Sequence, residues 1–139
     1  FGPGMPKNDY RVFPRFFNSI KKKQPITIFK SGKQTRTFCY VTDAITAMFL
    51  VTINGNKFVY NIGNDKPELN MKKLHQLIQK SLNKKIKSIN IEYPNNYPQV
   101  EPQRRCPDIT KLKKDFNFKN KVSITESIKR FYHWSSKYY

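Results

Sequence analysis

The arginines are the residues of this chain best suited to a specific chemical task. Only six of the 27 basic residues are arginine, and they are Arg11, Arg15, Arg36, Arg104, Arg105 and Arg130. A guanidinium is a planar fork that binds phosphate oxygens through two parallel hydrogen bonds, which a lysine ammonium cannot do. Arg36 opens a strand-like segment, and Arg105 lies in a long polar loop. If the fold brings these two together, they form a clamp for a diphosphate.

The alternative is that both arginines are neutralised within the chain. In that arrangement Arg36 pairs with a surface acid, and Arg105 pairs with Asp108, three residues further on. The residue types leave the clamp and this local pairing equally open. The elements that carry the arginines must decide between them.

Other chemistry has little support in the sequence. It contains no glycine-rich dinucleotide motif, no P-loop and no nucleophile elbow, so we assign no catalytic residue. The two cysteines, Cys39 and Cys106, and the two histidines, His75 and His133, are isolated from one another. A zinc site needs about four clustered ligands, so we expect no metal site and two free thiols in a reducing compartment.

The charge of the chain raises a second class of function. A formal net charge of +18 and a pI of about 10.0 are typical of a basic nucleic-acid-binding module. The lysines are scattered, however, and the aromatic residues lie at core spacing, so we keep a nucleic-acid-binding module only as the alternative. The sequence has no apolar stretch of about 18 residues, so we expect no membrane-spanning helix. A chain of 139 residues has the length of one modest domain.

Periodicity and turn residues predict alternating helices and strands, which is typical of an α/β fold with some parallel pairing. Thr42 is the expected N-cap of an apolar and therefore buried helix, with Asp43 in its first turn. Asn70 and Ser123 are expected to cap two further helices. The expected helices are 10–23, 43–53, 71–82, 109–116 and one starting after 123, and the expected strands are 25–29, 35–41, 58–63 and 87–93.

Four segments in this order carry a family resemblance: FGPGM with DYRVFPRF, PITIFKSGKQTRTFCYVTDAI, VYNIGN and RRCPDI. Together they resemble extended short-chain dehydrogenases/reductases of the NAD-dependent epimerase/dehydratase family, nearest to UDP-glucuronate decarboxylases. The resemblance implies the C-terminal substrate-binding part of a Rossmann-type fold, with residues 58–63 as the last edge strand and the N-terminal Rossmann core missing. Residues 1–139 would then be the nucleotide-sugar-binding region of a longer NAD-dependent enzyme. The lack of an initiator Met agrees with this expectation.

The resemblance also implies partners and a division of labour. NAD would be bound mainly by the missing N-terminal domain, and the catalytic Tyr and Lys would lie upstream, so this part alone is expected to be inactive. The substrate would be a UDP-sugar, and the full-length protein would be a cytoplasmic homodimer. Which sugar is used stays open. Whether decarboxylation, epimerisation or dehydration follows oxidation stays open as well.

The resemblance further implies roles for individual residues. Arg36 and Arg105 match the arginines that contact the nucleotide diphosphate. The segment that packs beside the nucleotide and sugar corresponds to Arg11, Val12 and Pro14. The short strand that lines the nucleobase corresponds to Thr27, Ile28 and Phe29. Asp43 is expected to cap its helix. Lys30 stands where many relatives have glycine, which puts the form of that turn in question.

Overall fold

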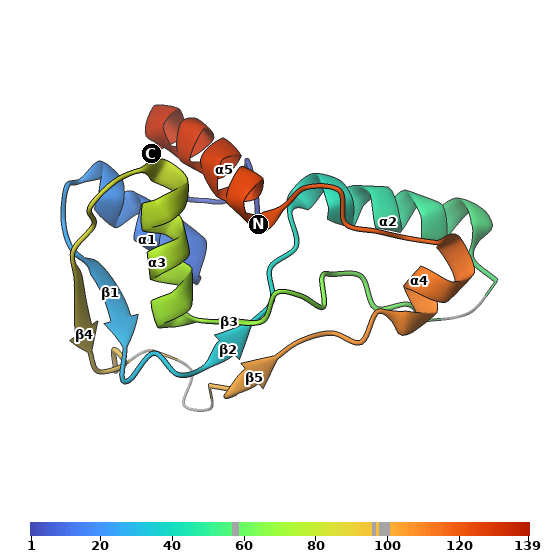
Figure 1. Ribbon diagram of the computed structural model, residues 1–139, viewed down its shortest axis with the longest axis horizontal. Coiled ribbons are helices and arrows are strands. Elements are labelled where there is room, and N and C mark those ends of the chain that lie inside the picture. Colours follow the sequence, from blue (N-terminus) through green and yellow to red (C-terminus); the bar gives the residue numbers. More distant parts are fainter. Residues whose placement is uncertain (57–58, 96, 98–100) are drawn as a thin grey trace.

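The computed structural model describes residues 1–56, 59–95, 97 and 101–139. The chain forms a larger half with α1, α3, α5, β1 and β4, and a smaller half with α2 and α4, joined by β2, β3 and β5 (Figure 1). In chain order the elements are α1 (Val12–Lys21), β1 (Ile26–Phe29), β2 (Thr35–Arg36), α2 (Val41–Asn54), β3 (Leu69–Asn70), α3 (Met71–Leu82), β4 (Ser88–Ile91), β5 (Arg104–Arg105), α4 (Thr110–Phe116) and α5 (Ile124–Tyr138).

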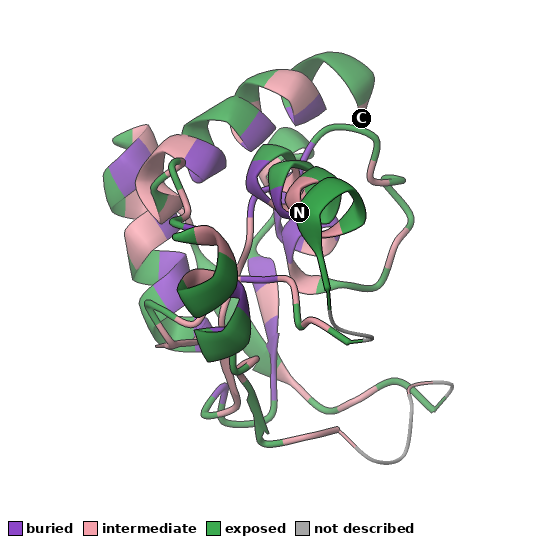
Figure 2. Ribbon diagram, turned by 90° about the vertical axis from the view of Figure 1, so that its right-hand side faces the viewer, coloured by how far each residue is buried: buried purple, intermediate pink, exposed green. Residues whose placement is uncertain are grey.

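The larger half holds the main hydrophobic core. Strands β1 and β4 pair in parallel, α1 packs against β1, and α3 packs against α5. Apolar residues three or four positions apart share one face of a helix, and these faces are buried here while the opposite faces are exposed (Figure 2). The buried apolar members of this core are Phe13, Phe16, Phe17, Ile26, Ile28, Met71, Leu74, Ile78, Ile128 and Phe131.

Local capping signals predict two helix starts correctly. The side chain of Asn70 accepts a hydrogen bond of 2.8 Å from the backbone N–H of Lys73, at the start of α3. The hydroxyl of Ser123 accepts one of 3.2 Å from the N–H of Glu126, at the start of α5. Both caps satisfy amide groups that have no partner inside the helix, so these starts are determined by a few neighbouring residues.

The small central sheet has β2 in the middle. β2 pairs antiparallel with β3 and parallel with β5, which places Thr35 beside Arg104 and Arg36 beside Arg105. Neighbouring residues along a strand point to opposite faces, and paired residues on adjacent strands point to the same face. The pairing therefore puts Arg36 and Arg105 on one face of the sheet.

Helix α2 contradicts the expectation of a buried helix that starts after Thr42. Its N-cap is Tyr40, and Thr42 lies inside the first turn. Asp43 is buried, but its Oδ2 accepts the backbone N–H of Val122 at 3.1 Å and does not cap its own helix. Ala47 is the buried apolar residue of α2, packed in the small core of the second half with Ile109, Leu112 and Phe118.

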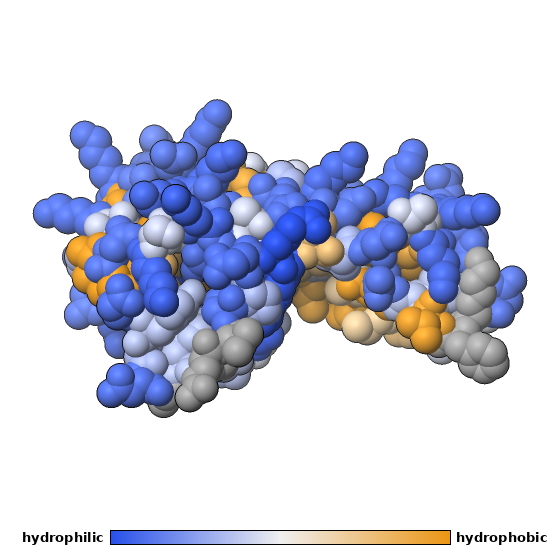
Figure 3. All heavy atoms as spheres, turned by 90° about the horizontal axis from the view of Figure 1, so that it is seen from below, coloured by the Kyte–Doolittle hydropathy of each residue, from blue (hydrophilic) through white to orange (hydrophobic). Residues whose placement is uncertain are grey.

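Several other apolar side chains of α2 face solvent, although Leu50 and Val51 pack against the small core. Exposed fractions reach 63% for Phe49 and 74% for Ile53, and Ile45 and Met48 are also exposed. Figure 3 shows apolar side chains gathered on the half of the molecule that carries α2 and α4. Hydrophobic composition predicted burial, but α2 has too few neighbours in this chain to cover its whole surface.

Two strand expectations are also wrong in part. The strand expected over 35–41 is reduced to Thr35–Arg36, because only these residues have paired neighbours on both sides. In the segment expected as a strand over 58–63, residue 58 lies outside the described residues and 59–63 have no strand structure. A lone extended segment has no ladder partner, so its sequence pattern cannot produce a strand by itself. Lys30 takes the left-handed conformation, with φ of 48°, which agrees with a position where glycine is common.

Candidate nucleotide-binding site

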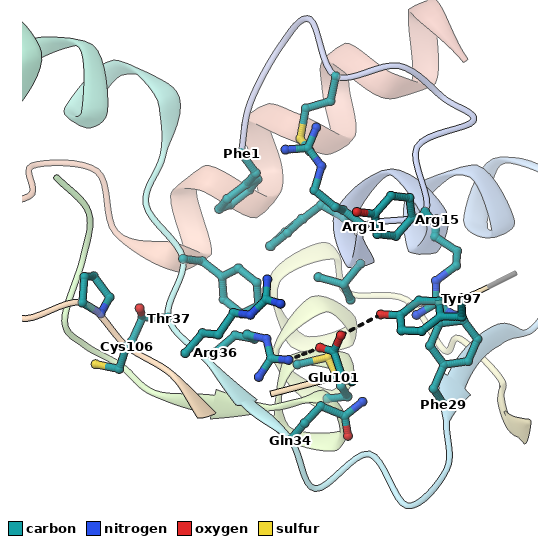
Figure 4. A pocket seen from close by; sticks show the side chains of 18 residues that line it. Phe1, Arg11, Arg15, Phe29, Gln34, Arg36, Thr37, Tyr97, Glu101 and Cys106 are labelled. Carbon is teal, nitrogen blue, oxygen red and sulfur yellow. Dashed lines mark hydrogen bonds and ion pairs between the residues drawn. The ribbon is translucent and has the colours of Figure 1, made fainter. Parts of the chain in front are cut away.

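A cavity of about 610 Å³ lies where α1, β1, β2 and β5 meet the N-terminal loop (Figure 4). Its lining combines four arginines with several aromatic rings. Arg36 and Arg105 come from the central sheet, and Arg11 and Arg15 come from the start of α1. A volume of this size is in the range of small-molecule sites, and the arginines favour an anionic ligand.

The strand register explains why Arg36 and Arg105 line the same cavity. They are paired residues of β2 and β5, so both side chains leave the sheet on the cavity side. Thr35 and Arg104 occupy the opposite face, where both interact with Glu68; Arg104 Nε lies 3.0 Å from Glu68 Oε1. The structure thus separates the adjacent Arg104 and Arg105 into different environments.

Arg36 is held in place by three groups. Its Nη1 donates to the carbonyl of Thr35 at 2.7 Å, and its Nη2 donates to the carbonyl of Pro102 at 2.7 Å and to the carboxylate of Glu101. The hydroxyl of Tyr97 donates to the other oxygen of that carboxylate at 3.2 Å (Figure 4). Arg36 therefore has the acidic partner that the local-pairing alternative expected, but this partner lies inside the cavity.

Arg105 does not have the partner that this alternative expected. The Oδ1 of Asp108 accepts the backbone N–H of Thr110 at 2.9 Å, and hydrogen bonding with the side chain and then the backbone of Thr110 lowers the pKa of Asp108. Within residues 1–56, 59–95, 97 and 101–139, no carboxylate forms an ion pair with Arg105. Its guanidinium is thus available to an anion that enters the cavity.

The other residues expected at the site divide into two groups. Arg11, Val12 and Phe29 line the cavity, whereas Pro14, Thr27 and Ile28 do not. Pro14 and Ile28 are buried in the core, and Thr27 holds the side chain of Arg15. The structure thus brings five of the eight expected residues together: Arg11, Val12, Phe29, Arg36 and Arg105.

Arg11 is exposed and forms an ion pair with Asp9. Its Nε lies 2.7 Å from Asp9 Oδ2, and its backbone N–H donates to Asp9 Oδ1 at 2.8 Å. The hydrogen bond from the Arg11 side chain lowers the pKa of Asp9 and raises the pKa of Arg11. This pair anchors the loop before α1 at the rim of the cavity.

Sequence reasoning assigned no role to Arg15, Tyr97 or Glu101, which also line the cavity. Arg15 was visible as one of the rare arginines, and its position four residues after Arg11 places it on the same side of the helix start. Tyr97 and Glu101 lie in the long loop before β5, and no sequence signal predicts which of its residues turn inward.

The described residues of the cavity are suited to binding a ligand and include no evident reactive group. The described part of the chain contains no cluster of three or more His, Cys, Asp or Glu side chains that could hold a metal ion. Cys39 and Cys106 are free and half-buried, as expected, and burial raises the pKa of the Cys39 thiol. No helix in the same part of the chain is long and apolar enough to cross a membrane.

Comparison with solved structures identifies the fold. A UDP-glucuronic acid 4-epimerase from Bacillus cereus superimposes with a TM-score of 0.85 at 22% identity, covering 100% of this chain and 43% of that one. A UDP-glucose 4-epimerase from Thermotoga maritima gives 0.86 at 22% identity, with 99% and 43% covered. The fold is that of the extended short-chain dehydrogenases/reductases, Rossmann-type α/β proteins, and this chain carries part of it.

Sequence comparison agrees with the fold. The profile of the NAD dependent epimerase/dehydratase family matches residues 1–63. UDP-glucuronic acid decarboxylase 1 of Arabidopsis thaliana is 32% identical over 130 residues, which are 94% of this chain and 29% of that protein. UDP-N-acetyl-alpha-D-glucosaminuronate decarboxylase of Bacillus cytotoxicus is 30% identical over 140 residues, with 96% and 43% covered.

Along residues 1–63 the chain carries the sequence pattern of the NAD-dependent epimerase/dehydratase family. Its relatives include UDP-glucuronic acid decarboxylases and a UDP-glucuronate 4-epimerase. The expected α/β class and the expected family are both confirmed. The chain spans less than half of the length of each of these proteins.

Proposed function

We propose that this chain binds the nucleotide diphosphate of a UDP-sugar, as part of an NAD-dependent decarboxylase, epimerase or dehydratase of the UDP-glucuronate decarboxylase type. The observation that carries the proposal is the pairing of Arg36 with Arg105 across β2 and β5, facing one cavity. Two guanidiniums on one face can each bind phosphate oxygens bidentately. The aromatic part of the lining suits a flat nucleobase.

The roles within the site follow from the chemistry of the ligand. Arg36 and Arg105 would hold the two phosphates, and Phe29, from β1, would lie along the base. When NAD is bound in the complete enzyme, it would accept a hydride from the sugar. The residues present do not fit NAD, because the chain has no glycine-rich turn of the kind that receives a dinucleotide. We therefore assign NAD to a part of the fold that this chain does not span.

Calorimetric titration with UDP tests the proposal. Charge-assisted hydrogen bonds contribute about 1.5–3 kcal/mol, so Arg36→Ala and Arg105→Ala should each weaken UDP binding by roughly tenfold to a hundredfold. Arg104→Ala is the matched control, because Arg104 carries the same charge on the other face of the sheet. If both cavity variants bind UDP as tightly as the unmodified chain, the site assignment is wrong.

A further inference from the structure

Arg15 has an unusual environment at the aromatic end of the cavity. Its guanidinium carbon lies 3.9 Å from the centroid of the Phe29 ring, close enough for a cation–π contact. Its Nη1 donates both to the carbonyl of Thr27 at 2.9 Å and to the hydroxyl of Thr27 at 2.7 Å. The position of the side chain is thus determined by β1, on which Thr27 and Phe29 lie.

The guanidinium of Arg15 also has donors that the protein leaves unused. Nε is buried without a hydrogen-bond partner, and Nη2 has no partner among the residues that the structure describes. No carboxylate in that part of the chain pairs with Arg15. Burial lowers its pKa to about 10. A desolvated guanidinium with unmet donors is costly, so an acceptor from a ligand would compensate for a real loss.

Tyr97 adds a second aromatic ring to this end of the cavity. Tyr97 lies 5.0 Å from Phe29, centroid to centroid, and stacks on Tyr93 at 4.6 Å. Figure 4 shows Arg15, Phe29 and Tyr97 together at one side of the cavity, with Arg36 on the other side of Glu101. A flat ligand group that reaches Phe29 and Tyr97 therefore meets the charged donor group of Arg15.

We infer that Arg15 selects the nucleobase, by donating a hydrogen bond to the C4 keto oxygen of a pyrimidine such as uracil. The inference rests on the proposed function, because it takes the phosphates to lie at Arg36 and Arg105. Uracil carries an acceptor oxygen at C4, where cytosine carries a donor amino group. A guanidinium can only donate, so a cytosine base would set donor against donor and leave Arg15 unsatisfied.

The inference predicts a preference that is measurable with plain nucleotides. By calorimetry the unmodified chain should bind UDP at least about tenfold more tightly than CDP, since one polar base contact contributes a factor of this order. Arg15→Met keeps a long side chain over Phe29 but removes every donor. In this variant the ratio of the two affinities should fall to about one, mainly because UDP binds more weakly.

Two matched variants separate base selection from a structural role. Arg15→Lys keeps a donor and should keep part of the preference, whereas Arg130→Met removes an exposed arginine that pairs with Glu126 and should change neither affinity. Circular dichroism melts show whether Arg15→Met is folded. If it is not, the UDP-to-CDP ratios of the unmodified chain and of Arg15→Lys decide the question.

The inference and the proposed function fail in distinguishable ways. Equal affinity for UDP and CDP in the unmodified chain, or an unchanged ratio in folded Arg15→Met, would overturn the role of Arg15 alone. In that case UDP binding would still depend on Arg36. Absence of UDP binding, or binding that does not respond to Arg36→Ala and Arg105→Ala, would overturn both.

Discussion

The carboxylate of Glu101 forms an ion pair with the guanidinium of Arg36 inside the cavity. Both side chains are largely covered, with 15% of Glu101 and 13% of Arg36 exposed. Among the described residues that line the cavity, Glu101 is the single acidic one. It faces Arg36, which we propose binds a phosphate of the diphosphate. A carboxylate and a phosphate compete for the same donors, so the pair marks the place that an anionic ligand would take.

Replacing Glu101 by Gln should therefore tighten UDP binding. In the variant UDP does not have to displace a carboxylate from Arg36. The negative charge of Glu101, which would repel the phosphates, is also absent. For a partly covered pair we expect a gain of about 1 kcal/mol, or about fivefold in the dissociation constant measured by calorimetry. Glu92→Gln changes the net charge equally from an exposed position and serves as the control. Weaker binding by Glu101→Gln would mean that Glu101 positions Arg36 and does not compete with the ligand.

Glu68 should make the central sheet sensitive to acid. Hydrogen bonds from Thr35 and then from Arg104 lower its pKa below the usual value of 4.5. The folded-state pKa lies below the unfolded one, so the stabilisation is present above about pH 4.5 and is lost as the pH falls through the folded-state value. Thermal melts of the unmodified chain and of Glu68→Gln should differ at pH 7 and converge at lower pH. A constant difference across the range would contradict this linkage.

Charged substitutions on α2 should leave the stability of this chain nearly unchanged. Phe49 and Ile53 are exposed, so Phe49→Glu and Ile53→Glu should shift the free energy of unfolding by no more than about 0.5 kcal/mol in urea titrations. Ala47→Leu on the buried side should cost about 1–3 kcal/mol through overpacking. The charged variants should also bind less of a dye that reports exposed apolar surface. A large loss of stability in Phe49→Glu would show that this face is covered.

Two glycines with positive φ provide a comparison of strain with steric overlap. A Cβ on Gly32 would lie 2.6 Å from Ile28 Cγ2, whereas a Cβ on Gly4 would meet no atom within 4 Å. Both substitutions strain the backbone, by about 1 kcal/mol. Gly32→Ala should lower the free energy of unfolding by roughly 1–3 kcal/mol more than Gly4→Ala, because the core must shift. Equal losses would mean that Ile28 moves without cost.

The chain alone should bind substrate without converting it. Its cavity supplies cationic and aromatic groups, and we assign the hydride acceptor and the reacting groups to a part of the fold beyond this chain. Incubation with NAD and UDP-glucuronate should therefore produce no NADH absorbance and no carbon dioxide. Turnover by the chain alone would contradict this division of labour.

Residue type and local capping predicted much of this molecule. Asn70 and Ser123 mark helix starts because the partners of their side chains lie within three residues. Residue type also directs attention to Arg36 and Arg105, because a guanidinium binds phosphate oxygens bidentately and a lysine ammonium cannot. Lys30, which stands where many relatives have glycine, takes the left-handed backbone conformation that glycine favours.

The failures concern contacts between distant segments. The exposure of α2 depends on how many other elements pack against it. The sequence of the helix alone does not reveal that number. Residues 59–63 have a strand pattern but lack a neighbouring strand in the structure. Glu101 reaches Arg36 only through the pairing of β2 with β5, so no local signal could have predicted their ion pair.

The pairing of Arg36 with Arg105 has a thermodynamic consequence. These residues belong to segments far apart in the chain, and they meet only when β2 and β5 are joined. An unfolded chain has no clamp, so a nucleotide held by both arginines binds the native state alone. Its binding free energy then adds to the free energy of unfolding, by about 2.7 kcal/mol at a hundred times the dissociation constant. The nucleotide-bound protein should therefore have a higher free energy of unfolding than the free protein.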